Sequence, residues 1–108
     1  MAASALHGKK LGILVSAAPS EPGFRHGLRL AETAVERGVE VYLYCVDEAV
    51  RGAEAAELQA LAKHGLKLYV CAYGGQKRNV PRNAETHYAG LALLSDLVAA
   101  VDRFVSFN

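Results

Sequence analysis

Cys71 is the residue whose surroundings most clearly suggest chemistry. It closes a short apolar run that begins at Leu66, and two glycines and the cations Lys77, Arg78 and Arg82 follow it. In an open α/β sheet, reactive groups collect at the carboxyl ends of the strands. The thiolate is the reactive form of a cysteine, and nearby cations favour it. The pattern predicts a reactive thiol whose anion is stabilised by Lys77 and Arg78. The alternative is a small apolar filler, because free cysteines are often buried.

Three further residues are second-rank candidates for the same site. Cys45 is a second working thiol, a resolving partner that forms a reversible disulfide with Cys71, or a core filler. Its place between apolar neighbours favours the filler. His87 is either a base near the thiol or part of a loop lining, and an isolated histidine favours the lining. Arg82 adds a third cation after the cysteine.

Length and composition limit the classes of function. The chain has 108 residues, 52% of them apolar and 21% charged, which is typical of one globular domain. We expect that single domain to span 1–108, with 1–9 a frayed lead-in. A net charge of +1 gives no general attraction to nucleic acid, so we expect no direct nucleic-acid contact.

The same reading excludes several cofactors and locations. Two cysteines lack the spacing of a zinc site or of a disulfide framework, so we expect no metal. The first strand is not followed by a phosphate-binding glycine pattern, so a nucleotide is the weakest reading and we expect no cofactor. The N-terminus lacks the apolar core of a signal peptide, and the longest apolar stretch is too short to span a membrane. We therefore expect a cytoplasmic protein without membrane contact.

The elements that would position Cys71 alternate between strands and helices. Continuous apolar runs predict buried parallel strands, and apolar positions three and four residues apart predict helices that end at Gly38 and Gly65. The fold class is α/β: a three-layer αβα, Rossmann-like arrangement with a mostly parallel sheet of four or five strands. Between Cys71 and the last helix we expect a long loop holding one helical turn, Gly75 to Asn79, whose N-terminus points at Cys71. The expected strands are Lys10 to Ala17, Val39 to Val46, Leu66 to Cys71 and Arg103 to Phe107; the expected helices are Phe24 to Arg37, Ala53 to His64 and Gly90 to Val101.

The last helix has two apolar stripes. Leu94 and Val98 belong to one stripe, and Leu93 and Leu97 belong to the other. A helix that is apolar on two sides is buried on two sides. In so small a chain, the second side predicts contact with another subunit.

Three stretches together carry a family resemblance. Cys71 is followed by AYGGQKRNV, YLYCVDEAV begins at Tyr42, and the chain closes with AGLALLSDLVAAVDRFVSF. In this order they resemble the small sulfur-relay proteins of the DsrE/DsrF/TusD type, over nearly the whole chain from Lys10. Two departures stand out. The turn after the cysteine has a glycine pair where the family often has Ala-Leu-Arg-Arg-Gly, and Asp47 is not followed by Gly-Val.

The resemblance implies a DsrE-like domain that acts as a sulfurtransferase. Cys71 would accept sulfane sulfur, carry it as a persulfide and pass it on, so the partners would be sulfur donor and acceptor proteins. The resemblance also implies a homo-oligomer, a trimer or a hexamer. The donor, the acceptor and the pathway, tRNA thiolation or sulfur oxidation, stay open. The alternative is a non-catalytic DsrE-like oligomeric subunit that binds a partner protein or a small anion through the loop 72–88.

Overall fold

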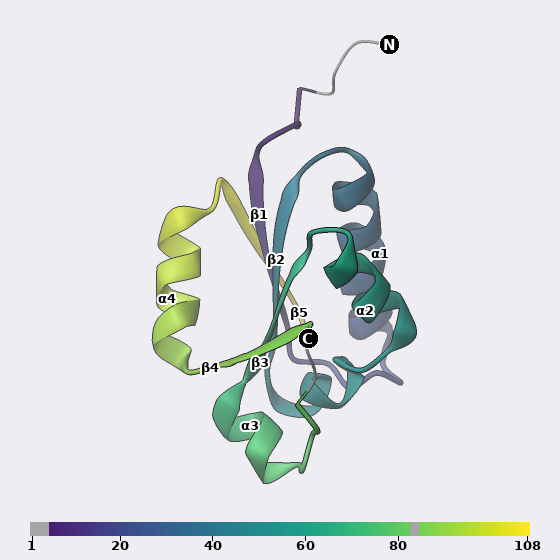
Figure 1. Cartoon of the computed structure of the whole chain (residues 1–108), viewed down its shortest axis with the longest axis vertical. Helices are drawn as coiled ribbons and strands as arrows, with labels where there is room; N and C mark the ends of the chain where they lie inside the picture. The colour runs from purple at the N-terminus through teal and green to yellow at the C-terminus, as the bar shows by residue number, and fades with distance from the viewer. Residues whose placement is uncertain (1–4, 83–84) are drawn as a thin grey trace.

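The fold is a five-stranded, fully parallel sheet with helices on both faces (Figure 1). It is seen in a computed structural model that describes residues 5–82 and 85–108. The strand order is β4-β3-β2-β1-β5. This confirms the predicted three-layer α/β class. The strands are β1 (Lys10–Val15), β2 (Glu40–Cys45), β3 (Lys67–Cys71), β4 (Thr86–Ala89) and β5 (Arg103–Phe107), and the helices are α1 (Pro22–Glu36), the 3-10 helix η1 (Asp47–Gly52), α2 (Ala56–Lys63), α3 (Ala72–Lys77) and α4 (Leu91–Ala100).

Strands β1, β2 and β3 form the centre of the sheet. Their apolar runs suit strands that are covered on both faces, because the side chains that point to either face of the sheet are then buried under helices. The register pairs Val15 with Cys45, and Cys45 with Val70. Ile13, Leu43 and Leu68 are at most 1% exposed, so the core lies across the middle of these strands.

The two faces of the sheet have different covers. Figure 1 shows α1 and α2 on one side, α4 alone on the other, and α3 beyond the carboxyl ends of the strands. Val15 faces α1, because a Cβ at Gly27 would lie 3.0 Å from its Cγ2 atom. Tyr44 faces the other way, since its hydroxyl reaches the carbonyl of Gly90, the residue that precedes α4. We call these the α1 face and the α4 face.

The ends of the first two long helices follow the sequence closely. Gly38 and Gly65 come directly after the helix caps and have φ angles of 79° and 112°, which glycine adopts without a steric penalty. The second helix differs from expectation at its start. Residues Asp47–Gly52 form a 3-10 helix, and α2 begins at Ala56 instead of Ala53.

The segment expected as a long loop contains two elements. Helix α3 starts at Ala72, three residues earlier than the predicted turn, and β4 extends the parallel sheet beside β3. The prediction missed β4 because it has only four residues and follows a basic, proline-containing stretch. Residues 83 and 84 of this segment lie outside the described residues.

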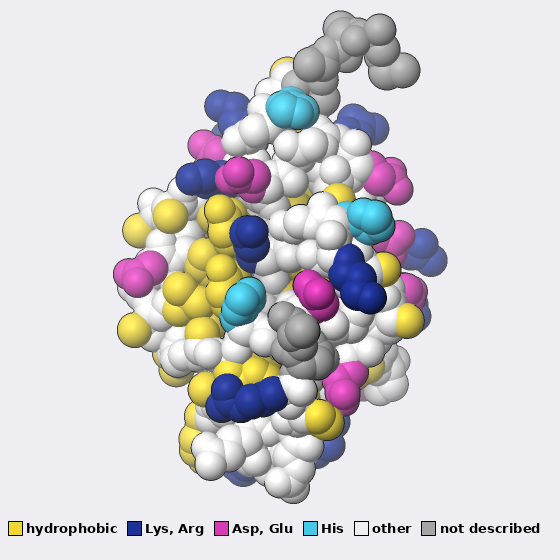
Figure 2. All heavy atoms as spheres, in the orientation of Figure 1, with side chains coloured by type: hydrophobic (Ala, Val, Ile, Leu, Met, Phe, Trp, Pro, Cys, Tyr) yellow, Lys and Arg dark blue, Asp and Glu magenta, His cyan; other side chains and the backbone are white. Residues whose placement is uncertain are grey.

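Helix α4 buries one side within this chain. Leu97 is 7% exposed, whereas Leu91 is 62% and Val98 is 50% exposed. Figure 2 shows apolar side chains gathered over α4 and in the strip beside it. The predicted second buried side is thus open in the isolated chain, and contact with another subunit stays a prediction.

Two further findings concern the ends of the chain and its helices. Of the predicted frayed lead-in, residues 1–4 lie outside the described residues, while the Gly8 amide donates to the Gly38 carbonyl at 3.0 Å. Within 5–82 and 85–108, no helix has the length and apolar character needed to cross a membrane.

Candidate functional site

Cys71 lies where a central strand turns into a helix. It is the last residue of β3 and the N-cap of α3, and its Sγ atom accepts a hydrogen bond from the Gly74 amide at 3.5 Å. An N-cap acceptor satisfies an amide that has no partner within its helix. The residue is 8% exposed, whereas Cys45 is 0% exposed. Both cysteines are buried, and Cys71 is the less completely buried of the two.

Gly75, the second residue of the glycine pair, lets α3 pack tightly against the sheet. A Cβ at Gly75 would lie 2.8 Å from the Cε2 atom of Tyr88 and 3.1 Å from Val70 Cγ1, closer than a side chain tolerates. The hydroxyl of Tyr88 in turn donates to the carbonyls of Val80 and Pro81. The segment after Cys71 is consequently fixed to β4, which holds the thiol in a defined frame.

Tyr44 is the residue near the thiol that sequence reasoning missed. Its side chain is completely buried, and its hydroxyl donates to the carbonyls of Ala89 at 2.7 Å and Gly90 at 3.1 Å. Ala89 is the register partner of Cys71. Burial first, and then the charge and hydrogen bond of the neighbouring Cys71 sulfur, raise the pKa of Tyr44 to about 12. A phenol therefore lies beside the sulfur.

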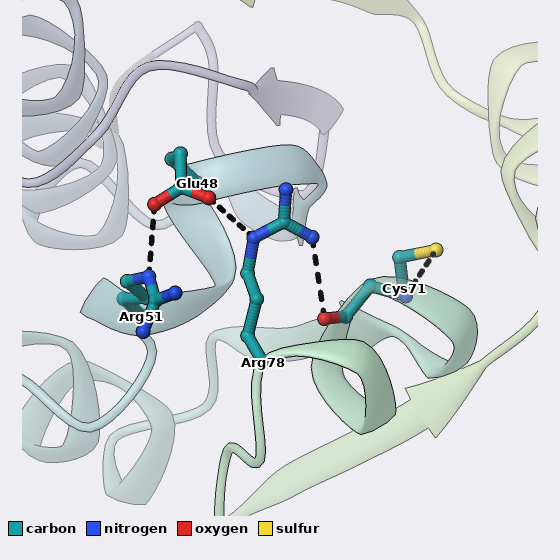
Figure 3. A network of polar contacts seen from close by, with 5 residues as sticks. Glu48, Arg51, Cys71 and Arg78 are labelled. Atoms are coloured by element: carbon teal, nitrogen blue, oxygen red, sulfur yellow. Dashed lines mark hydrogen bonds and ion pairs between the residues drawn. The ribbon is translucent and has the colours of Figure 1, made fainter.

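Arg78 is held by an acidic residue of η1. Its Nε atom donates to Glu48, whose other oxygen accepts from Arg51 at 2.8 Å, and its Nη1 atom donates to the Gly74 carbonyl at 3.4 Å. The hydrogen bond from Arg78 is the main cause that lowers the pKa of Glu48. Figure 3 shows the Cys71 sulfur pointing away from the guanidinium group. The thiolate-stabilising role of Arg78 stays a prediction, and as placed it would act at longer range.

The other two cations after the cysteine lie over aromatic rings. The Nζ atom of Lys77 is 5.8 Å from the centroid of the Tyr73 ring. The guanidinium carbon of Arg82 is 4.4 Å from the centroid of the Tyr88 ring. Cation–π contacts of this kind fix a long side chain at modest energy. Stabilisation of the Cys71 anion by Lys77, and a contribution from Arg82, stay predictions.

His87 lies on the same face of the sheet as Cys71, but two residues before its register partner. Its ring is 5.7 Å from that of Tyr69, which stacks on Tyr44 at 6.3 Å between centroids. Two residues of strand correspond to about 7 Å. The histidine is thus placed as the exposed end of a row of rings, and its role as a base stays a prediction.

Cys45 lies on the other face of the sheet, among the core residues. It pairs with Val15 and Val70, which both point toward the α1 face. Complete burial raises the pKa of this thiol to about 12. These surroundings favour the filler role over that of a second relay thiol.

The described part of the chain offers no obvious metal centre. Within residues 5–82 and 85–108, no group of three His, Cys, Asp or Glu side chains is arranged to hold an ion. At this edge of the sheet, a capped thiol and a buried phenol lie close together.

The match to a family model decides the family. The model of the DsrE/DsrF-like family matches residues 9–107, nearly the full length. The chain belongs to the DsrE/DsrF-like family. Among solved structures, this DsrE/DsrF-like chain is similar to the YchN protein of E. coli, with a TM-score of 0.78 and 17% identity over 92% of this chain and 99% of that one. At such low identity the likeness shows the shared fold. A search of the curated proteins found no match.

Proposed function

We propose that this protein is an intracellular sulfur-relay protein that accepts and passes on sulfane sulfur as a persulfide on Cys71. The observation that carries the proposal is the place of this thiol: it caps α3 at the carboxyl edge of the sheet, within a chain of the DsrE/DsrF-like family. A strand end places the sulfur at the carboxyl edge of the sheet, where open α/β folds bind their ligands. Family membership supports a sulfur-relay context in general, and the persulfide on Cys71 is the part we propose.

The reaction is an exchange between sulfur atoms. The thiolate of Cys71 attacks the outer sulfur of a donor persulfide, R–S–SH. A bond forms between Sγ and that sulfur, the donor's S–S bond breaks, and the donor leaves as the thiolate R–S⁻ with the bonding electron pair. The product is Cys71–S–SH, and no external oxidant or reductant is needed. The rate of such exchange depends on the thiolate fraction, the leaving group and access.

The local geometry supports the resting and loaded states of the carrier. The Gly74 amide already donates to the sulfur, and an amide donor favours an anion at that position. With the residue only 8% exposed, a persulfide there would meet little bulk water between donor and acceptor. Lys77, the last residue of α3, and Arg78, its C-cap, complete the proposal as contributors to a positive potential near the thiol.

The decisive experiment loads the protein with sulfur. Wild type, Cys71→Ser and Cys45→Ser are incubated with a cysteine desulfurase and cysteine, and intact masses are recorded without reductant. We expect a gain of one sulfur atom in wild type and Cys45→Ser, and none in Cys71→Ser. Serine is the matched control because its hydroxyl also caps helices. If no form gains sulfur with several donors, the non-catalytic binding subunit acting through 72–88 becomes the better reading.

We also propose that the protein self-associates and works in the cytoplasm with donor and acceptor proteins. The half-exposed apolar residues of α4, Leu91 and Val98, support contact with a second copy. Two free cysteines support a reducing compartment. The number of subunits, three or six, is measured as the mass of the native protein in solution.

A further inference from the structure

We infer that Tyr44 is a positioning residue for Cys71, whose hydroxyl turns from the Ala89 and Gly90 carbonyls to the sulfur when the thiolate or the persulfide anion forms. The inference rests on the proposed function only in taking Cys71 as the working thiol. It adds a donor from a different strand, β2, that neither the sequence pattern nor the family match assigns.

The path of the Tyr44 side chain carries the inference. Tyr44 pairs with Tyr69 on β3, so its ring starts two residues before the end of that strand. The hydroxyl nevertheless reaches the carbonyls of Ala89 and Gly90, at the carboxyl end of β4. The ring therefore leans along the α4 face, across β3, and its hydroxyl ends beside the register partner of Cys71.

The surroundings of the ring fix this direction. Tyr44 is fully buried and stacks on Tyr69 with an angle of 22° between the rings. A buried phenol keeps its hydroxyl paired, because an unpaired one loses the hydrogen bonds it makes to water. The contact with the Cys71 sulfur is one of the causes that raise the pKa of the phenol. The hydroxyl is consequently neutral, and a donor, throughout the pH range in which thiols ionise.

The hydroxyl has one proton and several acceptors within reach. Beside a neutral thiol, that proton is best placed on the carbonyls. Beside an anionic sulfur, donation to the charge is the stronger bond, since hydrogen bonds to ions are about twice as strong as neutral ones. Turning the C–O bond therefore lets one residue serve both states without moving the ring.

Other titratable groups surround the thiol, and the test has to keep them constant. Arg78 and Glu48 pair with each other, Lys77 lies over Tyr73, and His87 packs on Tyr69. The titratable side chains on β2, η1, β3, α3, β4 and α4, besides Tyr44 and Cys71, are Glu40, Tyr42, Cys45, Asp47, Glu48, Arg51, Lys67, Tyr69, Tyr73, Lys77, His87, Tyr88 and Asp96, and Arg78 follows α3 directly.

The experiment measures the rate of alkylation of Cys71 by iodoacetamide against pH, with peptide mapping to assign the modified thiol. In Tyr44→Phe we expect the midpoint of the profile to rise by about one pH unit, and the rate near neutral pH to fall about tenfold. The limiting rate at high pH stays as in wild type. A defect in packing alone would not move the midpoint while preserving that limit.

Tyr69→Phe is the matched control. It removes a hydroxyl from the adjacent ring of the same row, and burial followed by the charge of Tyr42 raises the pKa of this second phenol. Its alkylation profile is expected to overlay that of wild type. A folded Tyr44→Phe protein that also overlays wild type overturns the inference.

A second measurement keeps the test decisive where Tyr44→Phe does not fold. Fluorotyrosine placed at position 44 retains the ring and the hydroxyl, and its fluorine resonance reports the charge beside it. We expect this resonance to titrate with the midpoint of the alkylation profile and to lose that titration in Cys71→Ser. A resonance that ignores the ionisation of the thiol overturns the inference.

The two proposals fail separately. Alkylation needs no sulfur donor, so a normal Tyr44 effect with no sulfur gain would reject the relay function alone. Sulfur gain with no Tyr44 effect would reject the positioning role alone.

Discussion

Cys45 and Cys71 end two neighbouring strands of the sheet, yet their side chains point to opposite faces. The register pairs Cys45 with Val70, and Cys71 follows one residue later on β3. Because side chains alternate along a strand, one thiol faces α1 and the other faces α4. The backbone of the sheet lies between them.

We therefore predict that mild oxidation of the native protein forms no disulfide between these cysteines. Diamide treatment followed by intact mass measurement without reductant should show no monomer that has lost two hydrogen atoms. Iodoacetamide should label only Cys71 under native conditions, because burial raises the pKa of Cys45 to about 12. The control is the same treatment in urea, where both thiols react. A native peptide pair linked through both cysteines would contradict this prediction.

The adjacent glycines of α3 should respond differently to alanine. Gly75→Ala is expected to lower the free energy of unfolding by about 1–3 kcal/mol, since its Cβ would overlap the fixed ring of Tyr88. Gly74→Ala is the matched control, with a nearest contact of 3.5 Å, and should change stability by less than about 1 kcal/mol. Urea unfolding monitored by circular dichroism measures both. Helix propensity alone would stabilise both variants, so an equal change in the two would contradict a specific overlap of the Gly75 position with Tyr88.

Substitutions at two neighbouring residues of α4 should affect different properties, one the stability of the fold and the other self-association. Leu97→Ala is expected to cost about 2–4 kcal/mol, because this side chain is buried in the chain itself. Val98→Ser should change the free energy of unfolding of the monomer by less than about 1 kcal/mol and weaken self-association, seen as a lower sedimentation coefficient at equal concentration. An unchanged assembly in the double variant Leu91→Ser, Val98→Ser would place the interface elsewhere.

The Glu48–Arg78 contact should make the stability of the protein depend on pH in the acidic range. The hydrogen bonds from Arg78 and then Arg51 lower the pKa of Glu48 below its ordinary value of 4.5. The stabilisation is therefore fully present above that ordinary value and is lost as pH falls through the lower, folded value. Between pH 6 and pH 3, the melting temperature should fall less steeply in Glu48→Gln than in wild type. Parallel dependences on pH would show that the contact contributes nothing to stability.

The strands and helices that position the site could be predicted from the sequence better than the side chains that surround Cys71. Strand β5 runs from Arg103 to Phe107 as expected, because its apolar residues follow a clear break after the last helix. Cys71 was placed correctly at the end of β3, since an apolar run that stops at a cysteine is a local signal. The sequence predicts the start of helix α3 three residues too late, because Gly74 and Gly75 favour a turn on propensity alone, whereas both lie in a helix that packs through Gly75 against Tyr88.

The role inferred for Tyr44 could not be read from the sequence. It depends on the register between β2 and β3, and a slip of one residue would send the phenol to the α1 face. It also depends on β4, whose four residues gave no distinct signal. Long-range pairing of this kind leaves no trace in local spacing.

Cys71 is both the residue that caps α3 and the residue to which we assign the chemistry. Serine, threonine, asparagine and aspartate are good helix caps. A serine in place of Cys71 would therefore remove the sulfur atom and keep a capping group at the start of α3. The helix depends on a capping group at this position, whereas the proposed chemistry depends on the sulfur atom.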